Sequence, residues 1–237
     1  MWVYLRVDAQ PITTAWIYHS EDLWLISLSS DWQTWLTIAD KNLGATNVWD
    51  YWNYYQWGNN YWWATNATTK SSSQVNAWNY WPWNYYNSST FITWKANTWW
   101  DSSNNGNLRW WTTWTVESMQ WPCPSWYHIP SYSEFSSLST LLFTTFWLTK
   151  NWWTLNTYLK LPANWYIEED GNIGGGTQWN DWRYFSSSNV NARNSFWVYA
   201  TSSSANLVTW VAKAKWMWIR PFANTSTQPD SSRTKLY

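Results

Sequence analysis

The chain has 237 residues, and its 14 lysines and arginines balance its 14 aspartates and glutamates, so the formal net charge is zero. A chain of zero net charge has no net electrostatic field to attract nucleic acid or an anionic membrane surface. We therefore expect no nucleic-acid binding. No stretch approaches the roughly 18 consecutive apolar residues of a membrane-spanning helix, so we expect no membrane insertion either.

The first predicted element is a pair of strands. Apolar and polar residues alternate between Leu23 and Ile38 on both sides of Asp31-Trp32, which predicts two antiparallel strands joined by a turn. Residues 1–10 lack the basic segment and following apolar segment of a signal peptide. Because strands begin so early, we interpret residues 1–35 as an N-terminal strand segment of a longer, truncated chain.

One helix is well marked, after a long Asn-, Tyr-, Ser- and Thr-rich stretch over residues 50–107. Ser131 and Glu134 have the spacing of a capping box, which marks a helix start. Apolar residues follow at helical spacing, namely Phe135, Leu138, Leu141 and Leu142. The pattern predicts a helix over about 131–145, ending before Trp147, where helices favour glycine. A shorter helix is expected over 116–119.

Downstream of this helix the pattern predicts short strands, at Tyr158–Leu161, Phe196–Ala200, Leu207–Ala212 and Trp216–Phe222. Residues 225–237 are polar, and we expect a loose tail there. The sum is an α+β fold with short antiparallel strands and long irregular loops, in which residues 36–224 form one domain.

Tryptophan is unusually frequent, with 31 residues against 7 glycines. A soluble core cannot place so many indoles, because each needs burial and a partner for its N–H group. Several follow Asn or Asp where glycine would form a tight turn, as in Asp31-Trp32, Asn164-Trp165 and Asp181-Trp182. We interpret most of them as glycines encoded by UGA and read as tryptophan. A genuine aromatic carbohydrate-binding surface is the alternative.

Six short motifs follow one another along the chain. They are Asn42-Leu43-Gly44-Ala45-Thr46, Trp57-Gly58, residues 122–130, residues 159–166, residues 184–188 and residues 219–222. In this order they resemble the Fibrobacter succinogenes major paralogous domain, over roughly residues 36–224. The resemblance places glycines at Trp126 and Trp165 and a tryptophan at Trp57. Where the family often ends in cysteine this chain has Pro221, so the single Cys123 leaves no intramolecular disulfide.

The resemblance implies a C-type-lectin-like fold whose loops display a binding surface. In this chain the surface would be Tyr184–Trp210, where Tyr, Asn and Ser combine rigid aromatic area with adaptable hydrogen bonding. A plain solvated loop is the alternative for each residue. The candidate binding residues are Tyr184, Asn189, Asn191, Asn194, Tyr199 and Asn206.

Signals for catalysis and metal binding are weak. Cys123 and His128 lack any indication of the orientation that a nucleophile and its base need. The lectin-like segments Trp179-Asn180-Asp181 and Gln228-Pro229-Asp230 stand in reverse order relative to lectins. The oxygens of residues 168–172 could bind calcium, but an acidic turn before glycine explains them more simply. We therefore expect no catalytic residue, no metal and no cofactor.

The low charge and the abundant amides and hydroxyls suit an extracellular or cell-surface protein, although an AT-rich genome would produce a similar bias. We therefore predict a secreted or surface-displayed bacterial binding module that recognises a glycan or protein ligand. The alternative is a purely structural module of a multidomain surface protein.

Overall fold

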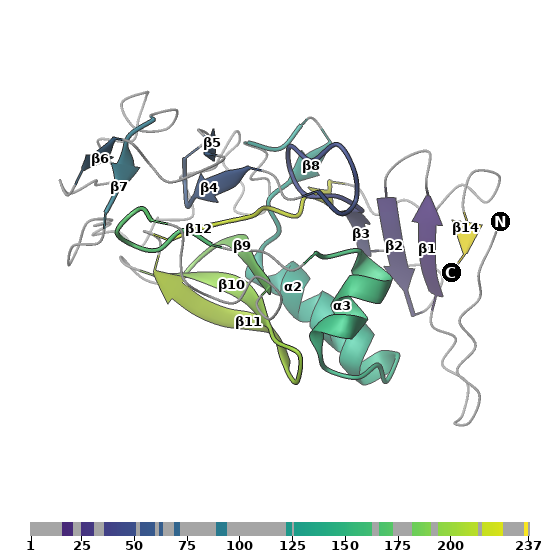
Figure 1. Cartoon of the computed structure of the whole chain (residues 1–237). Coiled ribbons are helices and arrows are strands. Elements are labelled where there is room, and N and C mark those ends of the chain that lie inside the picture. Colours follow the sequence, from purple (N-terminus) through teal and green to yellow (C-terminus); the bar gives the residue numbers. More distant parts are fainter. Residues whose placement is uncertain are drawn as a thin grey trace.

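The computed structural model describes residues 16–20, 25–30, 36–50, 53–59, 62–63, 69–71, 89–93, 122–124, 126–162, 166–172, 182–190, 194–212, 215–224 and 235–236. Within these ranges the chain forms a mixed α+β fold whose larger sheets are antiparallel (Figure 1). No helix of the described residues is both long and apolar enough to cross a membrane.

The largest sheet joins the beginning of the chain to its end. Its strands, in the order β14-β1-β2-β3-β13-β8, are Lys235–Leu236, Trp16–Ser20, Leu25–Ser29, Leu36–Ala39, Phe222–Ala223 and Tyr127–His128. The antiparallel pairing of β2 with β3, with Leu28 opposite Leu36, confirms the predicted strand pair. The sheet crosses the boundary expected after residue 35, and β14 adds a strand within the tail expected to be loose.

Three smaller sheets complete the β-structure. The largest is antiparallel in the order β11-β10-β9, which are Ala205–Ala212, Asn194–Ala200 and Trp182–Asn189. The second contains β12 (Trp216–Met217), β4 (Tyr54–Gln56) and β5 (Trp62–Trp63). The third is the parallel pair β6 (Lys70–Ser71) and β7 (Phe91–Ile92). The predicted strands at 196–200 and 207–212 are thus confirmed, whereas 216–222 forms strands at its two ends.

The predicted helix begins where the capping box places it. In α2 (Tyr132–Ser139) the Ser131 backbone N–H donates to Glu134 Oε2 at 2.7 Å, and Glu134 N–H donates to Ser131 Oγ at 3.3 Å. Its second part is a π-helical segment, η2 (Thr140–Thr145), that continues to bury Leu142. The helical region therefore ends at the predicted residue, although only its first part is α-helical.

A second helix replaces the strand predicted at 158–161. In α3 (Trp152–Leu159) the side chain of Asn151 accepts from Thr154 N–H at 3.1 Å, which is an N-cap. Leu155 and Leu159 are four residues apart and both fully buried, so the apolar pattern has helical period. The strand prediction was wrong because it took Leu159 together with Leu161, which follows the helix.

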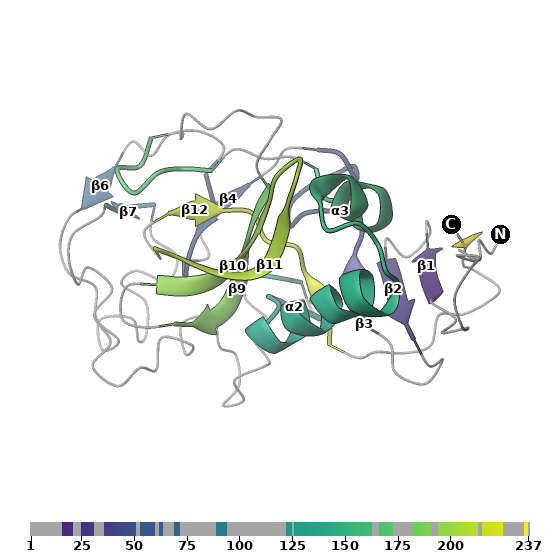
Figure 2. The ribbon, with the colours of Figure 1, turned by 90° about the horizontal axis from the view of Figure 1, so that it is seen from below.

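The core lies on both faces of the β9–β11 sheet. Figures 1 and 2 show α2 and α3 between this sheet and the six-stranded sheet. The larger apolar cluster fills that space and includes Tyr184, Val198 and Leu207 from β9–β11. A second cluster covers the opposite face with Phe185 and Trp197. The β9–β11 sheet is thus packed on both sides and forms a rigid platform.

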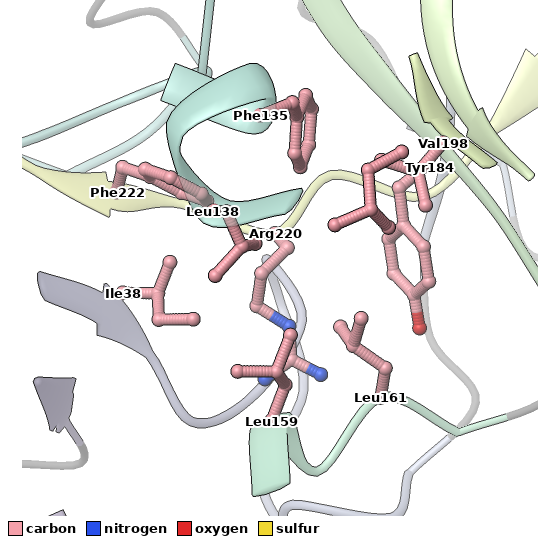
Figure 3. A pocket seen from close by; sticks show the side chains of 10 residues that line it. Ile38, Phe135, Leu138, Leu159, Leu161, Tyr184, Val198, Arg220 and Phe222 are labelled. Carbon is pink, nitrogen blue, oxygen red and sulfur yellow. The ribbon is translucent and has the colours of Figure 1, made fainter. Parts of the chain in front are cut away.

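Arg220 crosses the larger cluster beside a small void of about 10 Å³, otherwise lined mostly by apolar side chains (Figure 3). Its Nη1 donates to the Ala39 carbonyl at 3.0 Å, and its Nη2 donates to the Lys160 carbonyl at 2.8 Å. Complete burial lowers the pKa of Arg220, while Tyr184 and Asp40 oppose that shift. The void has room for about one water molecule, so it belongs to the core and is no ligand site.

The described tryptophans fall into contrasting environments. Among the described residues other than glycine, φ is positive at Trp126 (73°), Trp147 (54°) and Lys160 (52°). Trp126 and Trp147 are also 76% and 80% exposed. Trp57 and Trp182 are buried instead. Trp32 and Trp165 lie outside the described residues.

The two buried indoles also have hydrogen-bond partners. Nε1 of Trp57 donates to the Ser186 carbonyl at 3.2 Å, and Nε1 of Trp182 donates to the Leu161 carbonyl at 3.1 Å. The expectation that Trp182 stands at a turn is therefore wrong. It is the first residue of β9, it is 1% exposed, and its ring stacks on Trp152 with centroids 4.5 Å apart.

Candidate functional site

The structure separates the six candidate binding residues. Tyr184 is 1% exposed, and its hydroxyl donates to the Pro162 carbonyl at 3.0 Å. It therefore stabilises the core and cannot be displayed to a ligand, which corrects the expectation from the sequence. Asn191 lies outside the described residues, and Asn189 is described only by its backbone at the end of β9.

The other three candidates lie on β10 and β11. Asn194 and Tyr199 are half-buried on β10, and Asn206 is exposed on β11. Tyr199 and Asn206 are direct cross-strand partners. Arg183 on β9 is in turn the cross-strand partner of Tyr199. Directly opposite residues share a sheet face, so Arg183, Tyr199 and Asn206 form one transverse row, called here the Arg183 row.

Aromatic rings surround the guanidinium of Arg183. Its Cζ lies 3.6 Å from the centroid of the Tyr166 ring, 5.0 Å from that of Trp197 and 5.4 Å from that of Tyr199. Distances below about 6 Å allow cation–π attraction, which holds the flat guanidinium in place. Arg183 was missed by sequence reasoning because its neighbours come from a loop and from β10, and no local motif marks it.

A small charged network borders the Arg183 row. The Tyr166 hydroxyl donates to Glu168 Oε1, and Lys215 Nζ lies 2.9 Å from Glu168 Oε2. Burial and the Glu168 carboxylate raise the pKa of Tyr166 to about 12, so its phenol stays neutral at pH 7. Burial would raise the pKa of Glu168, but hydrogen bonds from Tyr166 and Lys215 outweigh it and the pKa is lowered. With Arg183 and Lys215 against one carboxylate, the group is net positive.

The acidic turn at residues 168–172 is explained by its own hydrogen bonds. Glu168 N–H donates to the Asn172 carbonyl at 2.8 Å, and Gly171 supplies a left-handed φ of 80°. Asn172 Oδ1 accepts from Lys70 Nζ at 2.9 Å, and its amide donates to Asp170. Within the described ranges no group of three or more His, Cys, Asp or Glu could hold a metal ion. The segments 179–181 and 228–230 lie outside those ranges.

Cys123 and His128 have structural surroundings. Cys123 is 2% exposed, and burial raises the pKa of its thiol, so a reactive thiolate is disfavoured. His128 Nε2 lies 2.7 Å from Glu134 Oε1, and Nδ1 lies 2.8 Å from Asn224 Oδ1. The imidazole thereby links β8 to the start of α2 and to the segment after β13.

Comparison of the chain with models of known protein families, with curated proteins and with solved structures found no match. The Arg183 row crosses three adjacent strands, with Arg183 and Tyr199 half-buried and Asn206 exposed. It presents a fixed cation, a phenol ring and an amide side by side. Such groups bind oxygen atoms of a ligand by hydrogen bonding and stacking, and they need no proton transfer.

Proposed function

We propose that the chain is a non-catalytic binding module of C-type-lectin-like architecture, displayed on or secreted from a bacterial cell, which binds a glycan or protein ligand through the Arg183 row. The observation that supports this proposal is the alignment of Arg183, Tyr199 and Asn206 on three adjacent strands. The motif resemblance supports the architecture and the bacterial surface location.

Rigidity is what makes this row suitable for binding. The guanidinium of Arg183 is already fixed by Tyr166, Trp197 and Tyr199, so a ligand does not have to order it. Asn206 lies two residues after the hairpin at 201–204, which Thr201 N–H closes onto the Ser204 carbonyl at 2.6 Å. Its exposed amide offers both donors and an acceptor. Sugar hydroxyls, carboxylates and peptide carbonyls are the ligand groups that match this set.

A binding screen with row variants tests the proposal. The chain is applied to an array of neutral and acidic glycans and to a panel of extracellular proteins, together with Asn206→Ala and Arg183→Lys. Arg183→Lys keeps the charge but removes the planar stacking surface. Thr157→Ala, exposed on α3, is the matched control.

We expect at least one ligand whose affinity falls tenfold or more in both row variants and is unchanged in Thr157→Ala. If the chain binds nothing on either panel, the proposal is overturned in favour of the purely structural module. Equal binding by all three variants also overturns it, because the ligand then uses another surface.

A further inference from the structure

The opposite face of the β9–β11 sheet carries a second surface feature beside the start of α2. Tyr132, Phe196 and Trp210 lie next to one another there and are called here the aromatic strip. The ring centroids of Tyr132 and Phe196 are 4.3 Å apart, with planes inclined by 50°. Phe196 on β10 is the direct cross-strand partner of Trp210 on β11. Tyr132 is 40% exposed and Trp210 is 63% exposed, so the strip is open to a ligand.

Strand alternation places this strip on the face away from the Arg183 row. Phe196 and Tyr199 are separated by three positions on β10, so their side chains leave the strand on opposite sides. Val198 shares the side of Phe196 and belongs to the larger core cluster, against which α2 packs. A ligand on the strip therefore does not contact the Arg183 row, and the two surfaces can be tested separately.

The backbone under the strip is hydrogen-bonded to the sheet and has no positive φ at Tyr132, Phe196 or Trp210. Tyr132 N–H donates to Ser188 Oγ at 2.9 Å, which fastens the start of α2 to β9. Trp210 lies in β11 opposite Phe196, and its φ is not among the positive values found at Trp126 and Trp147. The exposed side chain of Trp210 is therefore not accompanied by the left-handed backbone that is found at Trp126 and Trp147.

Two described side chains beside the strip are polar and neutral. Asn194 lies two residues before Phe196 on the same face of β10, and Ser133 is exposed beside Tyr132. Glu134, two residues after Tyr132 on α2, is bound to His128 and to the Ser131 backbone. A charged ligand would find no counter-charge among these residues. A surface with aromatic faces and a rim of amide and hydroxyl groups matches a molecule with apolar C–H faces and hydroxyl edges.

We propose that the aromatic strip binds a neutral pyranose unit of a glycan, stacked over Trp210 and Phe196, with its hydroxyls directed to the amide and hydroxyl groups of the rim. Aromatic rings supply large rigid contact area at low cost in conformational entropy. This inference goes beyond the proposed function, because it assigns a second ligand site on the opposite face of the β9–β11 sheet.

Calorimetric titration of the full chain tests the strip. The probes are cellohexaose, mannohexaose and N-acetylchitohexaose as neutral oligosaccharides, and a hyaluronan oligosaccharide as the acidic one. The variants are Trp210→Ala and Trp210→Phe. The matched control is Trp153→Ala, which removes an indole that is 59% exposed on α3. Circular dichroism confirms that each variant is folded, and exposure of Trp210 makes its loss tolerable for folding.

We expect at least one neutral probe to bind, with affinity reduced tenfold or more in Trp210→Ala, largely retained in Trp210→Phe, and unchanged in Trp153→Ala. Binding of the acidic probe alone, no binding of any neutral probe, or equal binding by Trp210→Ala overturns the inference. If a ligand is lost in Asn206→Ala but kept in Trp210→Ala, the proposed function stands and the strip is excluded as its site.

Discussion

Tryptophan side chains have opposite environments in the core and at the turns of this molecule. In the core, Trp57, Trp182 and Trp218 are at most 1% exposed, and the first two donate hydrogen bonds to carbonyls. At the turns, Trp126 before β8 and Trp147 after η2 are at least 76% exposed and adopt positive φ. Burial with a polar partner is the environment that suits an indole, and a left-handed backbone in water is the one that suits glycine.

This difference teaches that the tryptophans must be interpreted position by position. The two turn residues support the hypothesis that glycine codons have been read as tryptophan, because the backbone there takes the conformation that glycine favours. Trp57 has the environment of a genuine core tryptophan, because it is buried and its indole N–H is hydrogen-bonded. Trp182 follows Asp181 in the sequence as a turn glycine would, yet its environment is that of a core residue.

The largest expected effect comes from removing a core indole. Trp182→Gly should lower the free energy of unfolding by about 3–5 kcal/mol for the lost side chain, with about 0.5–1 kcal/mol more for glycine within a strand. Urea unfolding followed by far-UV circular dichroism measures it. Thr157→Ala, exposed on α3, should change stability by no more than about 0.5 kcal/mol. If Trp182→Gly is more stable than the parent chain, position 182 belongs with the turn positions Trp126 and Trp147 instead.

The turn positions should respond with the opposite sign. Trp126→Gly and Trp147→Gly should each raise the free energy of unfolding by about 1 kcal/mol, because a left-handed backbone costs an L-residue roughly 1–2 kcal/mol. Loss of two exposed indoles should also reduce aggregation, measured by light scattering. Trp210→Gly makes the same chemical change at an exposed but extended position and should be destabilising. Equal shifts in all three variants would contradict the role assigned to φ.

The helical region between the two turns offers a smaller test. Ser131→Ala removes the N-cap of α2 and should cost about 1 kcal/mol in the free energy of unfolding. Ser137→Ala, exposed on the same helix, should change it little. If the packing of α2 holds the turn at Trp147 in the left-handed conformation, weakening α2 with Ser131→Ala should also reduce the stability gained in Trp147→Gly. An unchanged gain in the double variant would show that the turn is set locally.

The smallest expected effect is a pH dependence at Glu134. Burial would raise the pKa of this carboxyl, but hydrogen bonds from His128 and Ser131 prevail and lower it. A lowered pKa stabilises the fold above the unfolded value of about 4.3, and this stabilisation is lost as the pH falls through the folded value. The melting temperature should therefore fall more between pH 7 and pH 3 in the parent chain than in Glu134→Gln. Parallel curves would contradict this role.

Local signals in the sequence predicted the local features of the fold. The Ser131–Glu134 capping box and the alternation between Leu23 and Ile38 each depend on neighbours within a few residues, and both correspond to observed elements. The helix α3 was missed because Leu155, Leu159 and Leu161 satisfy both helical and strand spacing over so short a segment.

The candidate surfaces depend on strand register, which no local pattern contains. Asn206 and Tyr199 were expected among the binding residues, but their pairing with Arg183 requires three strands in one specific alignment. A one-residue shift would move every side chain to the other face. Tyr184 was expected at the binding surface but is buried, because the alternation of side chains along β9 does not tell which of its faces packs against the core.

The two long-range hydrogen bonds of Arg220 also bear on how the chain is made. Its partners at Ala39 and Lys160 lie 181 and 60 residues earlier in the sequence. During synthesis the larger cluster therefore stays open until the segment that contains Arg220 has left the ribosome. Until β13 arrives, the edge of β3 that it covers lacks its final partner, and an open strand edge is a point of association between nascent chains. Slow translation of the segment that contains β13 would lengthen this exposure and make the protein more dependent on chaperones.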